Sequence, residues 1–172
     1  EEMVKELFLK ILPGAEAHIS NYYPVKNSLK QTNENDILIT YQNNLFVIEV
    51  KAGSFPSTPP ITDFDAHIKA YQKLAEAADS QCSRTVKYIA EHSPAQFYDH
   101  DKNPTFQLPG LDSFDHIFTF SVTVDNFNEF AAKAEKLSII SLKEETIVIS
   151  YDDLLVYADY FDNPICFLHY LR

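Results

Sequence analysis

Hydrophobic residues recur along this chain with two different periods, and each run predicts one element of secondary structure. Apolar residues at helical spacing predict helices over 1–12, 63–92, 126–136 and 151–161, and a last one that starts at 163–164. Runs of β-branched and aromatic residues predict strands over 18–23, 35–41, 45–51, about 115–124 and 146–150. Proline-rich or polar stretches separate these elements, notably at 54–62 and at 93–114, and predict loops.

The order of these elements indicates an α/β domain. A helix, three strands, a long helix and a further strand follow one another within residues 1–124. Residues 125–172 add helices and one short strand as a C-terminal extension. A chain of 172 residues can bury the core of one domain. We therefore expect a single domain, with its core at 1–124.

Three charged residues interrupt the two most apolar runs of the chain. Asp36 begins the run 35–41, and Glu49 and Lys51 end the run 45–51. A continuous apolar run is typical of a strand that is buried on both faces. Burying a carboxylate or an ammonium group there is costly unless a partner or a metal compensates. The three residues therefore indicate a built site.

The turn between the two strands decides whether these charges meet. Asn43-Asn44 suits a two-residue hairpin turn, because Asn tolerates positive φ. This turn pairs Gln42 with Leu45 and places Asp36 opposite Lys51. Because side chains alternate between the faces of a strand, Glu49 and Lys51 share a face, and Asp36 joins them there.

This arrangement resembles the PD-(D/E)xK, or restriction-endonuclease-like, nuclease superfamily. The resemblance rests on Asp36, twelve intervening residues and the triplet Glu49-Val50-Lys51, together with the apolar flanks and the Ala-Gly that follows. Asn35 stands where the motif has its loosely kept proline. The resemblance implies an αβββαβ core with a mixed central sheet flanked by helices. It also implies Mg²⁺-dependent hydrolysis of phosphodiester bonds in DNA, with RNA as an alternative substrate and Mn²⁺ as a substitute ion.

The resemblance further implies a role for each residue of the motif. Asp36 and Glu49, with the backbone carbonyl of Val50, would hold one Mg²⁺. Lys51 would orient the attacking water and stabilise charge on the phosphate. Many members of the superfamily complete the metal site with a Glu on the first helix. Glu1 matches that position loosely, although an acidic first turn favoured by the helix dipole explains it equally well.

Related nucleases often use the helix after the triplet to hold a phosphate or a water. Gln81 lies three residues past Ala78, at the edge of the apolar stripe of the predicted helix 63–92. His67 lies three residues past Phe64 on the same helix. We expect Gln81 and His67 to bind substrate; a polar helix surface is the alternative for Gln81.

The net charge of −11 argues against a simple nucleic-acid binder. The charge is unevenly distributed, because residues 1–92 have nine basic and twelve acidic residues, a net of −3, whereas residues 93–172 have a net of −8. We therefore expect the domain alone to bind DNA weakly. The sequence begins Glu-Glu-Met and stops inside an apparent helix, so we expect an excised domain whose neighbours in a longer chain supply substrate binding.

Two further patterns concern the cellular setting. The longest apolar runs are far too short to span a membrane, and no N-terminal segment is typical of a signal peptide. Cys82 and Cys166 lack the spacing of a metal site. We expect two buried free thiols in a reducing cytoplasm.

Two interpretations other than catalysis stay open. The three charges would form a buried ion pair between Asp36 and Lys51, with Glu49 held by backbone donors, if their role were structural. Such a pair is seldom a net gain in stability, so its cost stays unexplained. Alternatively, the domain is a non-catalytic module of the same fold that binds nucleic acid or a protein partner.

Overall fold

The computed structural model describes residues 1–26, 28–53, 56, 58–59, 61–124 and 142–172. Its elements are, in order, α1 (Glu2–Ile11), β1 (Glu16–Val25), β2 (Ser28–Tyr41), β3 (Asn44–Lys51), α2 (Phe64–Glu91), β4 (Ala95–Tyr98), β5 (Pro104–Leu108), the short 3-10 helix η1 (Leu111–Ser113), β6 (His116–Thr123), β7 (Ile147–Ser150), α4 (Tyr151–Tyr160) and α5 (Pro164–Tyr170). The helix expected at 126–136 lies outside the described residues.

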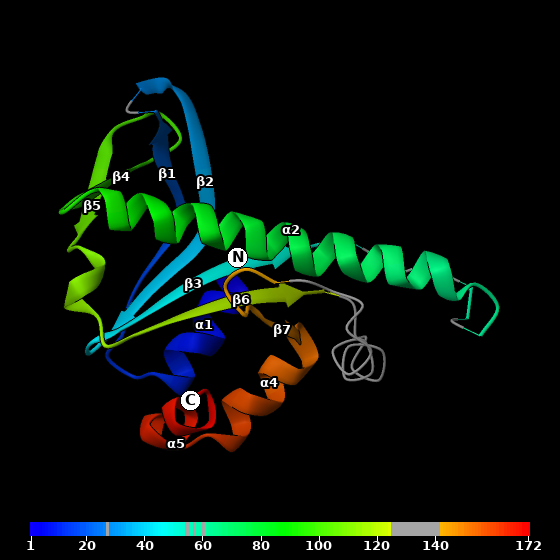
Figure 1. Cartoon of the computed structure of the whole chain (residues 1–172). Coiled ribbons are helices and arrows are strands. Elements are labelled where there is room, and N and C mark those ends of the chain that lie inside the picture. Colours follow the sequence, from blue (N-terminus) through cyan, green and yellow to red (C-terminus); the bar gives the residue numbers. More distant parts are fainter. Residues whose placement is uncertain (27, 54–55, 57, 60, 125–141) are drawn as a thin grey trace.

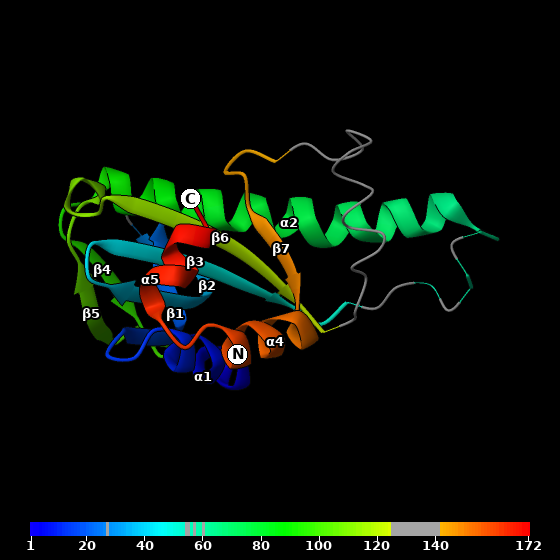
Figure 2. The ribbon, with the colours of Figure 1, turned by 90° about the horizontal axis from the view of Figure 1, so that it is seen from below.

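One seven-stranded sheet organises the described chain, in the order β5-β4-β1-β2-β3-β6-β7. Neighbouring strands are antiparallel from β5 to β3, and β3, β6 and β7 run parallel. Helix α2 covers one face of the sheet, and α1, α4 and α5 lie against the other (Figure 1). The same layers appear from below in Figure 2. The domain is therefore α/β, with a mixed sheet flanked by helices.

The central strands are buried on both faces, as their continuous apolar runs predict. Phe46 and Ile48 of β3 pack into a cluster with Phe8 of α1, whereas Val47 packs into a second cluster with Cys82 of α2. Each of these side chains is at most 1% exposed. Burial of such side chains is worth about 1.5–3 kcal/mol each before the entropy of ordering the chain is counted. The end of β3 is thereby fixed between two helical layers.

The strand predictions differ from the structure in three places. Strand β2 begins at Ser28, although it was expected to begin at residue 35. Strand β1 extends from Glu16 through Pro24 to Val25, beyond the expected range 18–23. Its second neighbour, β4, pairs with it at Tyr22 only, so the missing N–H of Pro24 interrupts no ladder there. The loop expected at 93–114 instead contains the β4–β5 hairpin. Pro104 is tolerated because it is the first residue of β5, an edge strand.

Side chains cap the first turns of α2 and α4. Asp63 accepts a hydrogen bond from the backbone N–H of Ala66, and Ser150 accepts one from Asp153 N–H. Cys82 is buried as expected, but Cys166 is exposed, because α5 turns that position away from the core. Among the described helices, none is long and apolar enough to cross a membrane.

Candidate functional site

The candidate site lies where the pairing of β2 with β3 ends. The described pairs run from Tyr41↔Asn44 to Ile37↔Ile48, so Asp36 lies one step beyond the last pair and faces Glu49. The expected register, with Asp36 opposite Lys51, is therefore wrong by two residues. The turn residues are Gln42-Asn43, with Gln42 at a φ of 52°. A shift of two keeps every side chain on its predicted face.

The turn moves because Asn44 belongs to the strand. Asn44 is 4% exposed, and its side-chain Nδ2 donates a hydrogen bond to the Tyr41 carbonyl oxygen at 3.1 Å. This bond satisfies the amino group of the side chain at the first position of β3, although the buried Oδ1 of Asn44 has no hydrogen-bond partner among the described residues. Gln42 then adopts the positive φ. The turn propensity of Asn favours Asn44 as the second turn residue, but the hydrogen bond from its side chain to Tyr41 outweighs this propensity.

Asp36 is held at the end of β2 by the neighbouring strand. Its Oδ2 accepts a hydrogen bond from the backbone N–H of Val50 at 2.6 Å and lies 4.0 Å from Lys51 Nζ. On the other side, Ser20 of β1 lies opposite Asp36, between the pairs Ile19↔Ile37 and Asn21↔Asn35, and has a φ of 52°. Val50 therefore meets Asp36 through its N–H; the role expected for its carbonyl stays a prediction.

Glu49 is the most buried charge of the site. Its side chain has no exposed surface, whereas Lys51 and Asp36 keep 17% and 18% of theirs exposed. Lys51 Nζ donates to Glu49 Oε2 at 2.8 Å, and Asn35 Nδ2 donates to Oε1 at 3.0 Å. Burial raises the pKa of Glu49 to about 7, and the charge of Asp36 adds to this shift; Lys51 and Asn35 oppose it. Solvent thus reaches the site from the side of Asp36 and Lys51.

Asn35 is a functional candidate that the sequence analysis did not identify. It is fully buried, and its Nδ2 also reaches the backbone carbonyl of Ile48 at 3.3 Å. Its Oδ1 is buried and has no hydrogen-bond partner among the described residues. A polar residue before Asp36 in an apolar strand is a signal for such a role, but the resemblance accounts for Asn35 only as a departure from the motif. Its contact fixes one oxygen of Glu49.

A second group of carboxylates gathers on the outer side of Asp36. Ligand oxygens of Glu1, Glu34 and Asp36 all lie within 4.8 Å of one another. Glu1 is the N-cap residue of α1, not a residue of its buried stripe, and its Oε2 accepts a hydrogen bond from Ser20 Oγ at 3.0 Å. Glu34 was not identified from the sequence, although it precedes Asp36 by two and shares its strand.

The negative charge of these carboxylates affects the pKa of Tyr22 on β1. Tyr22 pairs with Glu34 across the two strands. The pKa of Tyr22 is raised by burial, and then by its hydrogen bond to Glu34 and by the charges of Glu1 and Asp36. Three carboxylates at this separation repel one another unless protons or a cation intervene. The arrangement offers the oxygen ligands that Mg²⁺ and Mn²⁺ prefer.

The two substrate-binding candidates of α2 lie in different settings. His67 is buried in the first turn of the helix, and its Nε2 lies 2.6 Å from the carbonyl oxygen of Thr58. This end of α2 extends beyond the sheet in both views (Figures 1 and 2). Gln81 is half-buried, and its backbone carbonyl accepts a hydrogen bond from the Thr85 hydroxyl at 3.2 Å. Their contact with substrate stays a prediction.

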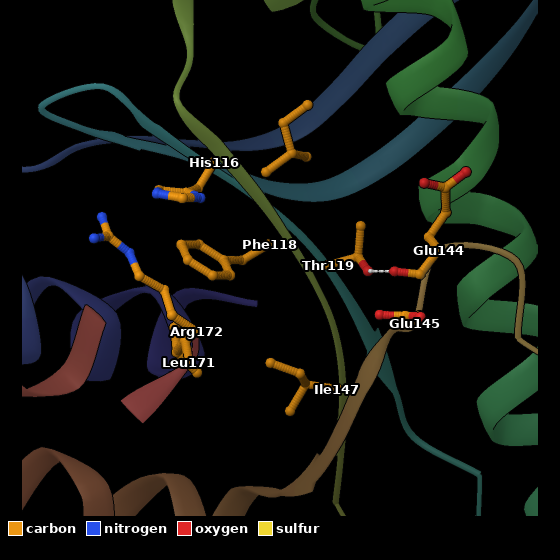
Figure 3. A pocket seen from close by; sticks show the side chains of 9 residues that line it. His116, Phe118, Thr119, Glu144, Glu145, Ile147, Leu171 and Arg172 are labelled. Atoms are coloured by element: carbon orange, nitrogen blue, oxygen red, sulfur yellow. Dashed lines mark hydrogen bonds between the residues drawn. The ribbon is translucent and has the colours of Figure 1, made fainter. Parts of the chain in front are cut away.

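A cavity of about 350 Å³ lies at the end of the parallel strands that is farther from the candidate site. Its residue His116 pairs with Asn44, whereas Glu49 pairs with Ser121. Figure 3 shows Arg172 extending toward His116, with Glu144 and Glu145 farther along the cavity. The dashed line there is the hydrogen bond from the Thr119 hydroxyl to the Glu144 carbonyl. Acidic and basic groups are mixed in this cavity, so its charge selects no ligand.

Comparisons with known proteins identify no family for this chain. No family model matches the sequence, and no curated protein matches it. The chain is similar to a crystal structure of protein VC1899 from Vibrio cholerae, at 13% identity and a TM-score of 0.38. The match covers 92% of this chain and 30% of that one. The chain thus spans less than a third of that protein, and a likeness at this TM-score carries no argument about function.

Proposed function

We propose that this domain is a divalent-metal-dependent nuclease of the PD-(D/E)xK type, acting on phosphodiester bonds of DNA or RNA. The observation that carries the proposal is the meeting of Asp36, Glu49 and Lys51 at the end of a buried hairpin. The order α1-β1-β2-β3-α2-β6, with β4 and β5 inserted before β6, supports the αβββαβ core that the motif implies. Residues 125–172 would then be an elaboration of this core.

The carboxylates around Asp36 fit a hard divalent ion. Asp36, Glu34 and Glu1 offer three carboxylate oxygens within 4.8 Å of one another, and Asn35 has a carbonyl oxygen without a partner in the described chain. Glu49 would join this set once Lys51 turns toward substrate. A bound Mg²⁺ or Mn²⁺ would polarise the phosphate and lower the pKa of a water. Binding would also relieve the repulsion within the cluster.

Residues near the proposed metal site would bind the phosphate and hold the two carboxylates in position. Lys51 Nζ lies 2.8 Å from Glu49 and 4.0 Å from Asp36, so its ammonium group is placed to donate to a water or to a phosphate oxygen. There it would stabilise the negative charge that grows on the phosphate in the transition state. Asn35 positions Glu49, and the Val50 N–H positions Asp36. The solvent-exposed parts of Asp36 and Lys51 mark the side from which substrate would enter.

The metal is tested by thermal unfolding. Mg²⁺ or Mn²⁺ should raise the melting temperature of the wild type, because a ligand at a hundredfold excess over its Kd stabilises by about 2.7 kcal/mol. Asp36→Asn should lose this increase, because Asp36 belongs to both proposed ligand sets. The control is Asp152→Asn, which removes an exposed carboxylate of α4 and should retain the increase. An equal increase in all three proteins would place the metal elsewhere.

Cleavage is tested on labelled DNA and RNA at low salt. Wild type should cleave slowly with Mg²⁺ or Mn²⁺, and a chelator should abolish cleavage. Lys51→Ala should abolish cleavage and keep most of the metal-induced stabilisation, because Lys51 acts on the water and the phosphate and not on the ion. If Lys51→Ala cleaves as fast as wild type, the activity belongs to another site or to a contaminant.

One observation favours a non-catalytic module as the second candidate. Glu49 is fully buried and already satisfied by Lys51 and Asn35, as in a structural ion pair. In that case metal would leave the melting temperature unchanged. Removing one partner by Lys51→Ala would instead destabilise the fold by about 3–5 kcal/mol. Denaturant unfolding of this variant in EDTA, beside the metal titration, separates the two candidates.

A further inference from the structure

A groove rich in basic residues lies between the second half of α2 and the end of the β1–β2 hairpin. Its volume is about 410 Å³. Arg84 and Lys87 line it from α2, and Lys26 lines it from the hairpin, with His92 at the end of the helix. We call this the basic groove. Glu91 is its one acidic lining residue.

The basic groove has an excess of positive charge, whereas the whole chain has a net negative charge. The chain has 14 Lys and Arg residues against 25 Asp and Glu, yet the groove collects three of the basic residues and one acid. Lys87 Nζ lies 3.8 Å from Glu91 Oε1, and both side chains are mostly exposed. Such a pair is worth little, so Lys87 stays available to another anion. A local positive potential in an acidic protein indicates a specific anionic partner.

The basic groove adjoins the candidate site through Tyr23. The Tyr23 hydroxyl lies 3.0 Å from the Thr85 hydroxyl, on the turn of α2 that carries Arg84. Burial raises the pKa of Tyr23, and the charges of Arg84 and Glu49 act on it in opposite directions. Tyr23 is therefore within electrostatic reach of both the basic groove and Glu49. Tyr23 also belongs to the same buried cluster as Val47 of β3, two residues before Glu49, and Cys82 of α2, two residues before Arg84.

The chemistry of the basic groove selects phosphates and not bases. Its two tyrosines, Tyr23 and Tyr88, are 1% and 7% exposed, so their rings form the floor and offer no stacking surface. The Tyr88 hydroxyl already donates to the Gln96 carbonyl oxygen at 2.6 Å. The exposed charged groups are the cations of Lys26, Arg84 and Lys87, and one carboxylate, that of Glu91. Contacts of this kind hold a nucleic-acid backbone without reading its sequence.

We propose that the basic groove binds the phosphate backbone of a nucleic-acid strand whose neighbouring phosphate lies at Asp36, Glu49 and Lys51. The proposal rests on the proposed nuclease function for the position of that neighbouring phosphate. The other residues of the chain include 11 Lys and Arg (14 − 3) against 24 Asp and Glu (25 − 1), so the basic groove supplies most of the electrostatic attraction that brings substrate to the site. Binding is sequence-independent and falls steeply with salt.

The test is the affinity of the domain for a labelled DNA of mixed sequence, measured in EDTA over a series of salt concentrations. The variant Arg84→Gln/Lys87→Gln removes two exposed cations of the basic groove. The matched control, Lys69→Gln/Lys73→Gln, removes two exposed cations from the first half of the same helix. Melting temperatures of both variants should match wild type. A further variant, Lys26→Gln, tests the facing wall.

The groove variant should bind about tenfold more weakly than the control, and the slope of log K against log salt should fall by about 2 for two lost phosphate contacts. Lys26→Gln should lower the slope by about 1. Equal weakening by the control pair would show a general charge effect and overturn the proposal. Equal competition by poly-glutamate, compared at the same charge concentration, would also overturn it, because the groove would then bind any polyanion.

The same proteins separate the groove from catalysis. If wild type cleaves but the groove variant binds and cleaves like wild type, the groove proposal fails and the nuclease stands. If no protein cleaves but the groove variant alone loses affinity, the groove stands as a nucleic-acid site and the nuclease fails.

Discussion

At the scale of single residues, the buried carboxyl group of Glu49 should make the free energy of unfolding depend on pH. Burial and the charge of Asp36 raise its pKa from 4.5 to about 7, against the opposing effects of Lys51 and Asn35. Between these two values the folded state keeps a proton that the unfolded state has lost. The free energy of unfolding therefore falls as pH rises through this window and levels off above it. The ionised side chain costs the fold about 3 kcal/mol at the upper end.

Glu49→Gln should remove this cost. In EDTA at about pH 8 the variant should be more stable than wild type, and the difference should shrink as the pH falls to about 4, where the folded and unfolded carboxyl groups are both mostly protonated. Denaturant unfolding across this range measures it. Glu6→Gln, at an exposed position of α1, should show no such pH dependence. Destabilisation by Glu49→Gln at every pH would indicate a structural ion pair.

The residues that could be predicted are those whose position follows from strand periodicity. Asp36, Glu49 and Lys51 meet because side chains alternate, and that rule survives a register error of two. Asn35 and Glu34 depend on more than one element. Asn35 reaches Glu49 where the two strands have ceased to pair, and Glu34 forms its carboxylate cluster with Glu1, the N-cap residue of α1. A local pattern can mark Asn35 as unusual, but it does not show which residues Asn35 and Glu34 contact.

At the scale of elements, the β2–β3 turn shows where a local rule was applied to the wrong pair of residues. Gln42 has a φ of 52° at the first turn position, and Asn43 is not among the residues with positive φ in the described chain. A positive φ at the first position alone is typical of a turn that favours glycine there. The β4–β5 hairpin was missed for a related reason: prolines indicated a loop, although an edge strand tolerates one at its first residue.

Gln42→Gly should therefore stabilise the hairpin. Relief of the left-handed conformation is worth roughly 1–2 kcal/mol, and the greater freedom of glycine in the unfolded chain offsets about half of it. Urea unfolding should show a net gain of about 0.5–1 kcal/mol. Asn43→Gly is the matched control at the neighbouring position and should lose stability. A gain from Asn43→Gly and a loss from Gln42→Gly would mean that the expected Asn43-Asn44 turn forms after all.

At the scale of the whole molecule, the distribution of charge connects stability with substrate binding. The net charge of −11 implies mutual repulsion across the folded surface, while the basic groove beside Tyr23 keeps a local excess of positive charge. Composition alone showed the first feature and argued against a nucleic-acid partner. The second feature needs Lys26 of the hairpin to meet Arg84 and Lys87 of α2, which only the fold brings about. Salt should therefore act on the two properties in opposite directions.

Raising NaCl from about 50 mM to about 500 mM shortens the screening length from roughly 14 Å to roughly 4 Å. Repulsion among the acidic residues should weaken, so the melting temperature in EDTA should rise with salt. Affinity for DNA should fall over the same range. When the basic groove binds phosphates, the DNA releases its bound cations, and this release is less favourable in a more concentrated salt solution. Differential scanning fluorimetry and fluorescence anisotropy on one protein preparation measure both trends. A melting temperature that falls with NaCl would mean that attractive pairs such as Lys10–Asp159 outweigh the net repulsion. A DNA affinity independent of salt would remove the electrostatic basis of the groove.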